Sequence, residues 1–199
     1  MVSPTIASAT AGAVRCEDGV LRCSWAVADP LLRAYHDTEW GRSVHGEQAL
    51  LERICLEGFQ AGLSWLTVLR KRPAFRAAFA DFDPDTVAAL TDDEIEALAQ
   101  LPAIIRNRAK INAARGNARA VLGLRPHGGL DALLWSYADP GAFHPRTALD
   151  VPAQTPSSVR MAQELKALGF RFVGPTTCFA LMEATGMVNT HLMGCHRRG

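Results

Sequence analysis

The chain has 199 residues, of which 48% are hydrophobic and 21% are charged. This is the composition of a globular protein with one domain or two small ones, and it excludes a disordered or fibrous chain. No apolar run is long enough to span a bilayer, and residues 1–13 lack the features of a signal peptide. We therefore expect a cytoplasmic protein with no membrane partner.

The net charge of +1 conceals two halves of opposite sign. Residues 1–99 hold 9 Lys/Arg and 15 Asp/Glu, whereas residues 100–199 hold 12 and 5. No acid lies between Glu96 and Asp131, an interval that contains the bases Arg106, Arg108, Lys110, Arg115, Arg119 and Arg125. A basic, acid-free stretch of this kind could bind a polyanion. Charge alone, however, favours a solvated basic helix.

The apolar residues recur with helical spacing almost throughout, which predicts an all-α fold after a flexible extension over residues 1–21. A short alternation at Phe170–Val173 is the main hint of a strand. In chain order, a first helix is predicted to begin at Asp29-Pro30, a second to cover 46–61, and a third to run from a Ser64 cap through Leu69. The next helices are predicted over 73–79, from Asp83-Pro84 onward, and from a Thr91 capping box to Leu101. The last four are predicted over 106–122, 131–137, 157–168 and 175–185.

One carboxylate lies on an apolar face of the predicted 46–61 helix. Glu57 follows Leu50 and Ile54 at a spacing that places all three on one side. A buried, unpaired carboxylate is costly unless it has a partner or a shifted pKa, and such residues are often functional. The alternative is a structural Glu that caps a neighbouring helix or pairs with an Arg.

Aromatic residues gather near this carboxylate and near the N-terminus. Trp65 follows Glu57 across a glycine-containing break, and Trp25 lies ten residues before the segment 35–40, which contains Tyr35 and Trp40. Trp offers a large stacking face for a flat or cationic ligand. The cluster indicates a pocket for an aromatic ligand, although Trp and Tyr are more often core residues.

Five cysteines are an odd number, and without a secretion signal they do not predict a disulfide framework. His191 and Cys195 are one helical turn apart, and Cys23 and His36 form a second pair of ligand types. Together they would saturate tetrahedral zinc and leave no open position, so the site would be structural. By type alone, Cys16, His45 and His196 are equally suitable ligands, and the cysteines could instead be small buried hydrophobic residues.

The sequence resembles the bacterial DNA-3-methyladenine glycosylase I family from about residue 22 to residue 195. The most specific stretch is Glu-Gly-Phe-Gln-Ala-Gly-Leu-Ser-Trp at 57–65. The other matching stretches are 22–25, 29–31, 35–41, 54–56, 104–108, 116–120, 170–174 and 188–195. The chain departs from the family pattern at Leu32, where the family has Tyr, and at Ala103, where it has Gly. Ala disfavours a positive φ, so we expect a tighter or shifted turn at Ala103.

The resemblance implies a helix-hairpin-helix glycosylase fold over residues 22–199, with two helical lobes and the hairpin near 101–105. It implies a structural zinc that ties the N-terminal segment to the C-terminal one, with the ligands Cys23, His36, His191 and Cys195. It implies catalytic roles for Glu57 and Tyr35, with the base held by Trp65, Trp25 and Trp40. We also expect DNA contacts from the residues of the helix break and the hairpin: Gly62, Leu63, Ala103, Ile105, Arg106, Arg108 and Lys110.

The implied activity is base-excision repair by a monomer. The enzyme would flip 3-methyladenine out of double-stranded alkylated DNA, hydrolyse its N-glycosidic bond and release the free base. The pocket segments contain no Schiff-base Lys, so we expect no lyase activity. The acid-free interval covers the position at which related enzymes keep a catalytic Asp, which fits labile, cationic lesions. The alternatives are a non-catalytic, zinc-stabilised DNA-binding module and a zinc-dependent hydrolase with three protein ligands.

Overall fold

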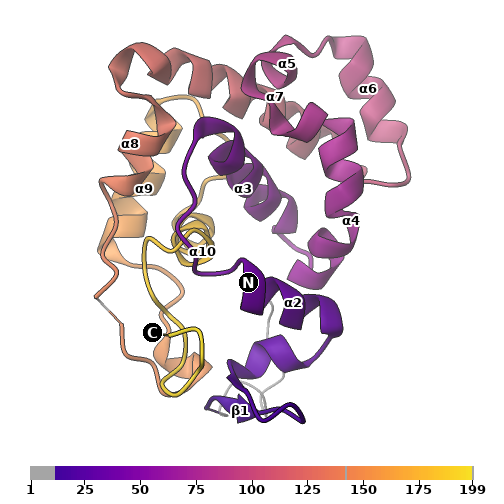
Figure 1. Cartoon of the computed structure of the whole chain (residues 1–199). Helices are drawn as coiled ribbons and strands as arrows, with labels where there is room; N and C mark the ends of the chain where they lie inside the picture. The colour runs from indigo at the N-terminus through magenta and orange to yellow at the C-terminus, as the bar shows by residue number, and fades with distance from the viewer. Residues whose placement is uncertain (1–11, 142, 199) are drawn as a thin grey trace.

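A computed structural model describes residues 12–141 and 143–198, which fold predominantly into helices (Figure 1). Among these residues, no helix is long and apolar enough to cross a membrane. The elements in chain order are β1 Val14–Arg15, β2 Leu21–Arg22, η1 Ser24–Val27, α2 Pro30–Thr38, α3 Glu47–Gln60, α4 Trp65–Ala78, η2 Ala80–Phe82, α5 Pro84–Ala89, α6 Asp92–Gln100, α7 Arg108–Leu124, η3 Arg125–His127, α8 Gly129–Trp135, η4 Ala148–Asp150, α9 Pro156–Ala167 and α10 Pro175–Ala184.

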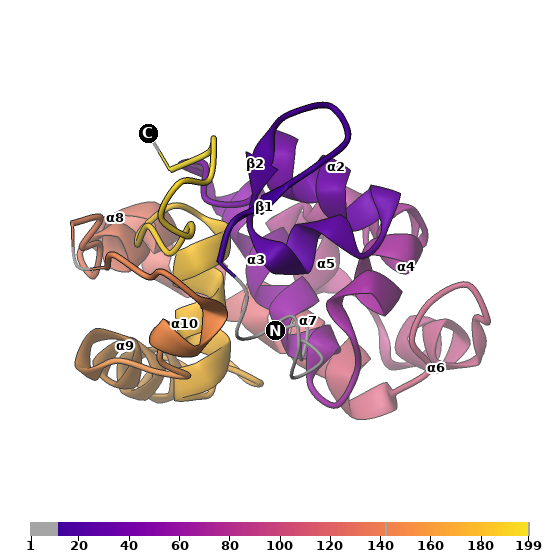
Figure 2. The ribbon, with the colours of Figure 1, turned by 90° about the horizontal axis from the view of Figure 1, so that it is seen from below.

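Two local predictions about strands need correction. Residues 14–22, which were expected to lie mostly in a flexible extension, contain the antiparallel pair β1–β2, with Val14 opposite Arg22. The C-terminal segment covers this hairpin, because the His196 N–H donates to the Leu21 carbonyl at 2.9 Å (Figure 2). At 170–173 no strand forms, because Phe172 takes a φ of 57°, which is incompatible with extended backbone. The prediction for residues 1–11 lies outside the described residues.

The sequence placed two helix boundaries incorrectly. The segments 65–69 and 73–79 form one helix, α4, with Pro73 inside it. The buried residues Val68 and Phe75 flank Pro73, and burial of this face offsets the lost backbone hydrogen bond. Helix α7 begins at Arg108 and not at Arg106, because the Asn107 side chain caps it by accepting from the Lys110 N–H at 3.1 Å.

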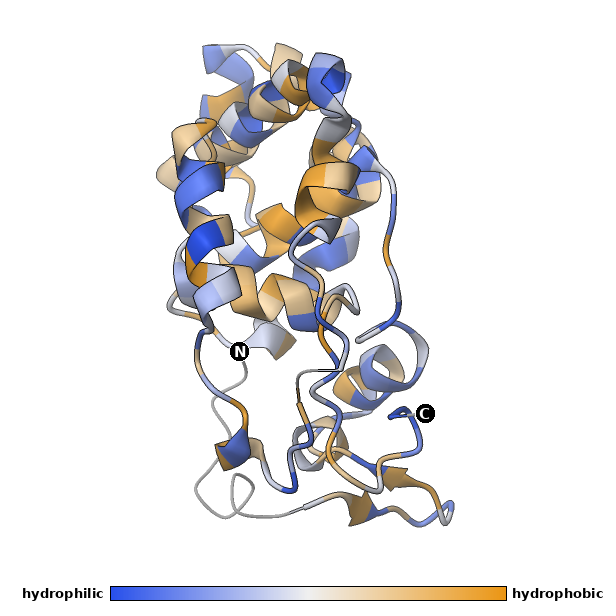
Figure 3. Ribbon diagram, turned by 90° about the vertical axis from the view of Figure 1, so that its left-hand side faces the viewer, coloured by the Kyte–Doolittle hydropathy of each residue, from blue (hydrophilic) through white to orange (hydrophobic). Residues whose placement is uncertain are grey.

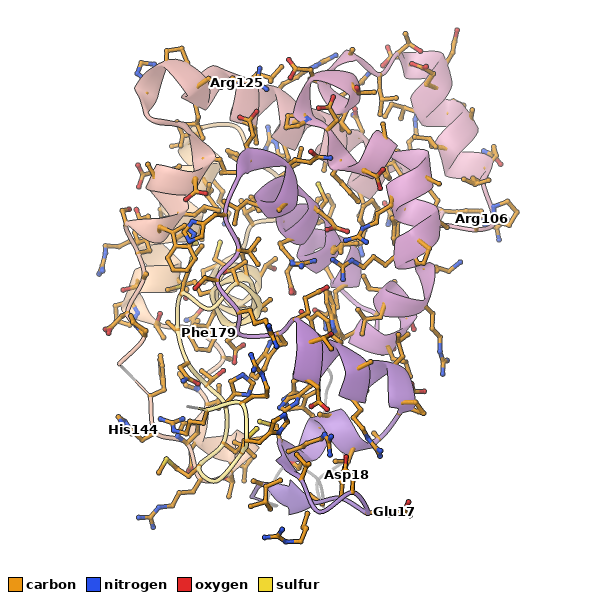
Figure 4. The ribbon with its side chains drawn as sticks, in the orientation of Figure 1. Glu17, Asp18, Arg106, Arg125, His144 and Phe179 are labelled. Atoms are coloured by element: carbon orange, nitrogen blue, oxygen red, sulfur yellow. The ribbon has the colours of Figure 1, made fainter. Side chains whose placement is uncertain are left out.

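Helix α3 runs through the middle of the molecule, and every residue from Leu50 to Gln60 is buried (Figure 1). The outer helices carry both hydrophobic and hydrophilic residues (Figure 3). Helix α10 packs on α3 and α9, and its residue Phe179 lies in the interior (Figure 4). Because α3 is buried on all sides in this stretch, it needs partners for every polar side chain that it carries.

Two of these polar side chains belong to an ion-pair network that joins α2, α3 and α4. Glu52 accepts from Arg72 Nε at 2.9 Å and from Arg76 Nε at 2.6 Å. Glu39 accepts from Arg72 Nη1 at 2.6 Å and lies 3.1 Å from Arg53 Nη2. Burial opposes ionisation of Glu52, but the hydrogen bonds from Arg72 and Arg76 outweigh it and lower its pKa to about 2.

Glu52→Ala is expected to lower the free energy of unfolding by about 3 kcal/mol at pH 7, because it leaves buried arginines without their carboxylate. The folded pKa lies below the unfolded value, so this contribution is fully present above about pH 4.5 and is lost as the pH falls toward 2. Urea unfolding at pH 7 and pH 3 measures both effects. The matched control is Glu96→Ala, which removes an exposed ion pair with Arg108 and should change stability by less than about 1 kcal/mol.

The acid-free interval is neither a solvated helix nor a free basic surface. Arg125 pairs with Glu47 and Asp85, and Arg115 pairs with Asp92. The guanidinium groups of Arg115 and Arg119 also donate to backbone carbonyls at the ends of α5, those of Leu90 and Ala88. Five of the six bases of this interval, all except Arg106, thus contact the first half of the chain.

Candidate base pocket and metal-ligand cluster

A cavity of about 140 Å³ opens between α2, α3, α4 and α10. This is on the order of ten times the space that one water needs. The sequence-predicted residues Tyr35, Glu57, Trp65, Trp25 and Trp40 all line it. The remaining lining residues are Gln60, Ala148, Val151, Ala180, Glu183, Thr190 and Leu192.

Glu57 lies in the last turn of α3 and is buried, with 6% of its surface exposed. Burial raises its pKa to about 7. The rings of Tyr35 and Trp65 lie beside each other, with centroids 5.4 Å apart and planes tilted by 52°. The carboxylate therefore shares one cavity with large aromatic surfaces, in an environment where the addition of a positive charge would favour its ionised form.

Three donor groups in the cavity lack partners among the described residues. They are the Tyr35 hydroxyl, the Gln60 side-chain amide and the Trp65 indole N–H, and each is buried. Buried donors are normally satisfied, so an unsatisfied set around one cavity indicates a ligand that carries acceptors. A flat heterocycle with ring nitrogens meets this requirement, because it can accept in its plane while its face packs on Trp.

Sequence reasoning missed Gln60, Glu183 and Thr190. Gln60 lies three residues after Glu57, on the same side of α3 and within the specific stretch 57–65. Glu183 is buried in α10, where the other residues from Cys178 to Ala184 are apolar. The signal that identified Glu57, an acid in an apolar helix, was therefore present for Glu183 as well.

Glu57→Gln is expected to stabilise the ligand-free protein by about 3 kcal/mol at pH 8 and to have little effect at pH 4. The folded pKa of Glu57 is about 7 and its ordinary value is 4.5, so ionising it in the folded state costs stability as the pH rises between these values. Urea unfolding of both proteins at the two pH values measures the difference. Equal stability at pH 8 would contradict the burial of an uncompensated charge.

Four ligand-type side chains meet at the junction of the chain ends. The ligand atoms of Cys23, His36, His191 and Cys195 all lie within 4.8 Å of one another, and all four residues are buried. Cys195 Sγ lies 3.3 Å from His36 Nε2 and 3.7 Å from His191 Nδ1, and Cys23 Sγ lies 3.7 Å from His191 Nδ1. A tetrahedral zinc with sulfur and nitrogen ligands requires edges of about 3.5 Å. The cluster can therefore hold a metal ion.

Neighbouring groups orient the two histidine rings. His36 Nδ1 lies 2.8 Å from Asp37 Oδ1, which leaves Nε2 to face the cluster. Asp37 is in turn held by Arg22. Gly41 has a φ of +75°, and a Cβ there would lie 2.6 Å from His191 Nε2, so glycine makes room for this ring. Cys16, His45 and His196, which were equally suitable by type, do not belong to the cluster.

The break between α3 and α4 presents Leu63 on the surface, 40% exposed. Gly62 has a φ of +81°, which the tight reversal requires. Lys110 was expected to contact DNA, but its ammonium is buried and donates to the carbonyls of Phe59 at 2.9 Å and Ala61 at 2.6 Å. Lys110 therefore lies beneath the connection between α3 and α4, where its hydrogen bonds hold the C-terminal end of α3.

The connection between α6 and α7 carries the other predicted DNA contacts. Lys71 donates to the carbonyls of Pro102 and Ala103, both at 3.0 Å, and ties this connection to α4. Ala103 is exposed and avoids positive φ, and Ile105 is half-buried. Arg106 points away from the body and has no hydrogen bond or ion pair with any described residue (Figure 4). Leu32, the other departure from the family pattern, is a core residue.

The sequence profile of the family described as methyladenine glycosylase matches residues 25–198. The chain is 46% identical over 177 residues to DNA-3-methyladenine glycosylase 1 of Escherichia coli (strain K12), and the alignment covers 87% of this chain and 95% of that protein. It is 41% identical to the DNA-3-methyladenine glycosylase of Haemophilus influenzae, over 87% of this chain and 96% of that one.

The chain belongs to the methyladenine glycosylase family. It is thereby an enzyme of the class that hydrolyses N-glycosyl bonds. Solved structures agree: a crystal structure of a 3-methyladenine DNA glycosylase I has a TM-score of 0.86 at 44% identity and covers 89% of this chain and 100% of that one. The Staphylococcus aureus glycosylase studied for 3-methyladenine recognition has a TM-score of 0.85 at 34% identity, over 89% and 96% of the two chains. The expected predominantly helical glycosylase fold is confirmed at this level.

Proposed function

We propose that this chain excises 3-methyladenine from double-stranded DNA by hydrolysing the N-glycosidic bond, and that it has no lyase activity. The observation that carries the proposal is the cavity in which a buried Glu57 lies with Tyr35 and Trp65. The related proteins named above, two of them bacterial glycosylases and one solved for recognition of 3-methyladenine, support the substrate.

The chemistry of the lesion explains the residue types. Methylation at N3 makes adenine cationic and already a good leaving group, so little general-acid help is needed. Ionised Glu57 accepts a hydrogen bond from the exocyclic amine and compensates positive charge, and Tyr35 orients the edge of the base. Trp65 stacks on the ring, and a cationic ring strengthens this contact by roughly 1–2 kcal/mol. Neutral adenine leaves the carboxylate uncompensated, which is the basis of discrimination.

When the N-glycosidic bond breaks, its electron pair leaves with the base, which is released as neutral 3-methyladenine. Water then adds to the oxocarbenium-like sugar and gives up a proton to solvent, while Glu57 and the DNA phosphates stabilise charge. Before this step, the damaged base must leave the DNA duplex, which costs a few kcal/mol of unstacking. Leu63, exposed next to Gly62 in the α3–α4 break, fills the vacated position. The connection 101–107 between α6 and α7 acts as the phosphate-holding hairpin, with Arg106 adding a salt-dependent contact. Hydrogen bonds from Lys110 and Lys71 hold the break and the hairpin in place.

The metal in this proposal is a structural zinc. Cys23, His36, His191 and Cys195 supply the sulfur and nitrogen ligands that zinc prefers, at tetrahedral spacing. When bound, zinc would hold the segment after β2 against the C-terminal segment and take no part in the reaction. Four protein ligands leave no open coordination position, which argues against the zinc-dependent hydrolase.

The alternative of a non-catalytic DNA-binding module leaves the buried Glu57 and the unsatisfied donors of the cavity without a purpose. The activity is tested by incubating the protein with methylated duplex DNA and looking for free 3-methyladenine, abasic sites and strand breaks. We expect free base and abasic sites without strand cleavage. A covalent adduct trapped by borohydride would show a Schiff-base mechanism and contradict the monofunctional assignment.

Arg106→Ala is expected to weaken DNA binding and to reduce the slope of log K against log salt concentration by about 0.9, the value for one phosphate contact. Arg125→Ala is the matched control, because that guanidinium is already held by Glu47 and Asp85. Binding to undamaged duplex DNA, measured by fluorescence anisotropy over a range of salt concentrations, reports both slopes. An unchanged slope for Arg106→Ala would remove this residue from the interface.

A further inference from the structure

The cavity that holds Glu57 contains a second carboxyl group on another helix. Glu183, on α10, lines the same cavity and is 9% exposed. Two carboxyl groups in one small cavity repel each other when both are ionised, and each loses hydration. Neither group is explained by the packing of the helices, which would be served as well by a neutral side chain of the same shape.

Only one of the two carboxylate oxygens of Glu183 accepts a hydrogen bond from a described residue. The Thr190 hydroxyl donates to Oε1 at 2.7 Å, and Oε2 accepts no hydrogen bond from a described residue. Burial raises the pKa of Glu183 to about 7, a rise that the Thr190 hydroxyl opposes and the charge on Glu57 increases. One carboxylate oxygen is therefore fixed, and the other is free to meet a ligand.

No cation among the described residues compensates these groups inside the cavity. Among the described residues, none of those lining it is Lys, Arg or His. Among the described residues, the cation whose charge acts on Glu57 is Arg53, and it is engaged by Glu39 and Glu52 outside the cavity. Tyr35 is the other titratable lining residue, and burial raises its pKa, so it stays neutral. A positively charged ligand would supply the missing compensation.

We propose that Glu183 is a second base-recognition residue, whose carboxylate acts with that of Glu57 to select cationic purines over neutral ones. This inference rests on the proposed glycosylase activity and assigns part of its specificity to α10. Glu57 alone already favours the purine that brings a charge, and a second carboxylate in the same cavity increases this preference. Glu183 thus affects the ratio of the affinities for cationic and neutral purines more than it affects the affinity for the purine ring itself.

The test compares the binding of two small purines. The probes are 3,9-dimethyladeninium, which is permanently cationic, and 9-methyladenine, which is neutral, and calorimetry gives both dissociation constants. We expect Glu183→Gln to weaken binding of the cation about tenfold and to leave binding of the neutral purine unchanged. An equal loss for both probes, or no loss for the cation, would overturn the proposal. Glu164→Gln, an exposed change on the adjacent helix α9, should behave as wild type.

A second pair of variants keeps the test decisive if Glu183→Gln does not fold. Thr190→Val removes the hydroxyl that fixes Glu183, and Thr190→Ser retains it. We expect Thr190→Val to lose about threefold of the preference for the cation and Thr190→Ser to keep it. Full preference in Thr190→Val would overturn the role of this hydrogen bond in recognition. Release of 3-methyladenine from DNA by the wild-type protein tests the proposed activity separately. If no base is released, the activity is refuted. If base is released but the Glu183 variants keep the selectivity of wild type, only the role of Glu183 is refuted.

Discussion

Glu57→Gln is expected to lower the single-turnover rate of 3-methyladenine release by about 10²–10³-fold, the cost of removing one pre-positioned electrostatic group. The amide keeps the shape of the carboxyl but cannot compensate the positive charge that the lesion brings into the cavity. The rate should be measured with enzyme in excess over methylated duplex DNA, so that product release does not limit it.

The control for this variant is the state of its fold. Because Glu57 is an uncompensated buried acid, Glu57→Gln should fold, retain the metal and resist urea at pH 8 at least as well as wild type. Glu96→Gln changes an exposed carboxyl in the same half of the chain and should leave the rate unchanged. If Glu57→Gln loses its fold, Glu57 is a structural residue and the catalytic assignment fails.

Loss of the proposed zinc is expected to have the largest effect on stability. Cys195→Ala should lose the bound zinc and lower the midpoint of thermal unfolding by about 10–20 °C, because several kcal/mol of ligand binding are lost and each kcal/mol is worth about 2–4 °C in a chain of this size. Chelation of the wild-type protein should produce a shift of the same size. Elemental analysis should find one zinc per chain before treatment.

Cys16→Ser is the matched control, since Cys16 lies near the same end of the molecule but outside the ligand cluster. It should retain one zinc and unfold close to the wild-type temperature. A Cys195→Ala protein that keeps its stability but loses base release would show that the metal takes part in the reaction. That result would favour the zinc-dependent hydrolase over the structural site.

Much of the site could be predicted from particular residues. Glu57 was found because an acid recurs with Leu50 and Ile54 on a helix, and the structure places it in the same cavity as Tyr35 and Trp65. By the same reasoning Glu183 is detectable from the sequence, because it is an acid among the apolar residues of α10. The four metal-type ligands could not be paired from spacing alone, because their proximity depends on how the two chain ends fold back on each other.

The errors have a common physical cause, which is tertiary contact between distant segments. Lys110 looked like a phosphate contact from its place in a basic stretch, yet α3 ends beside it and takes its ammonium. The β1–β2 hairpin looked like a flexible extension because the C-terminal residues that cover it are some 175 positions away. Pro73 looked like a helix boundary because burial on both sides of it is not visible in the local sequence.

Whether the buried carboxylate pocket selects a cationic base for hydrolysis is tested directly by counting the free bases that wild-type protein releases from methylated duplex DNA. The released bases are separated by chromatography. We expect free 3-methyladenine to accumulate, with no release of unmodified adenine and one abasic site for each base released. Binding of the same DNA without any released base would contradict the claim and would identify the chain as a non-catalytic DNA-binding module.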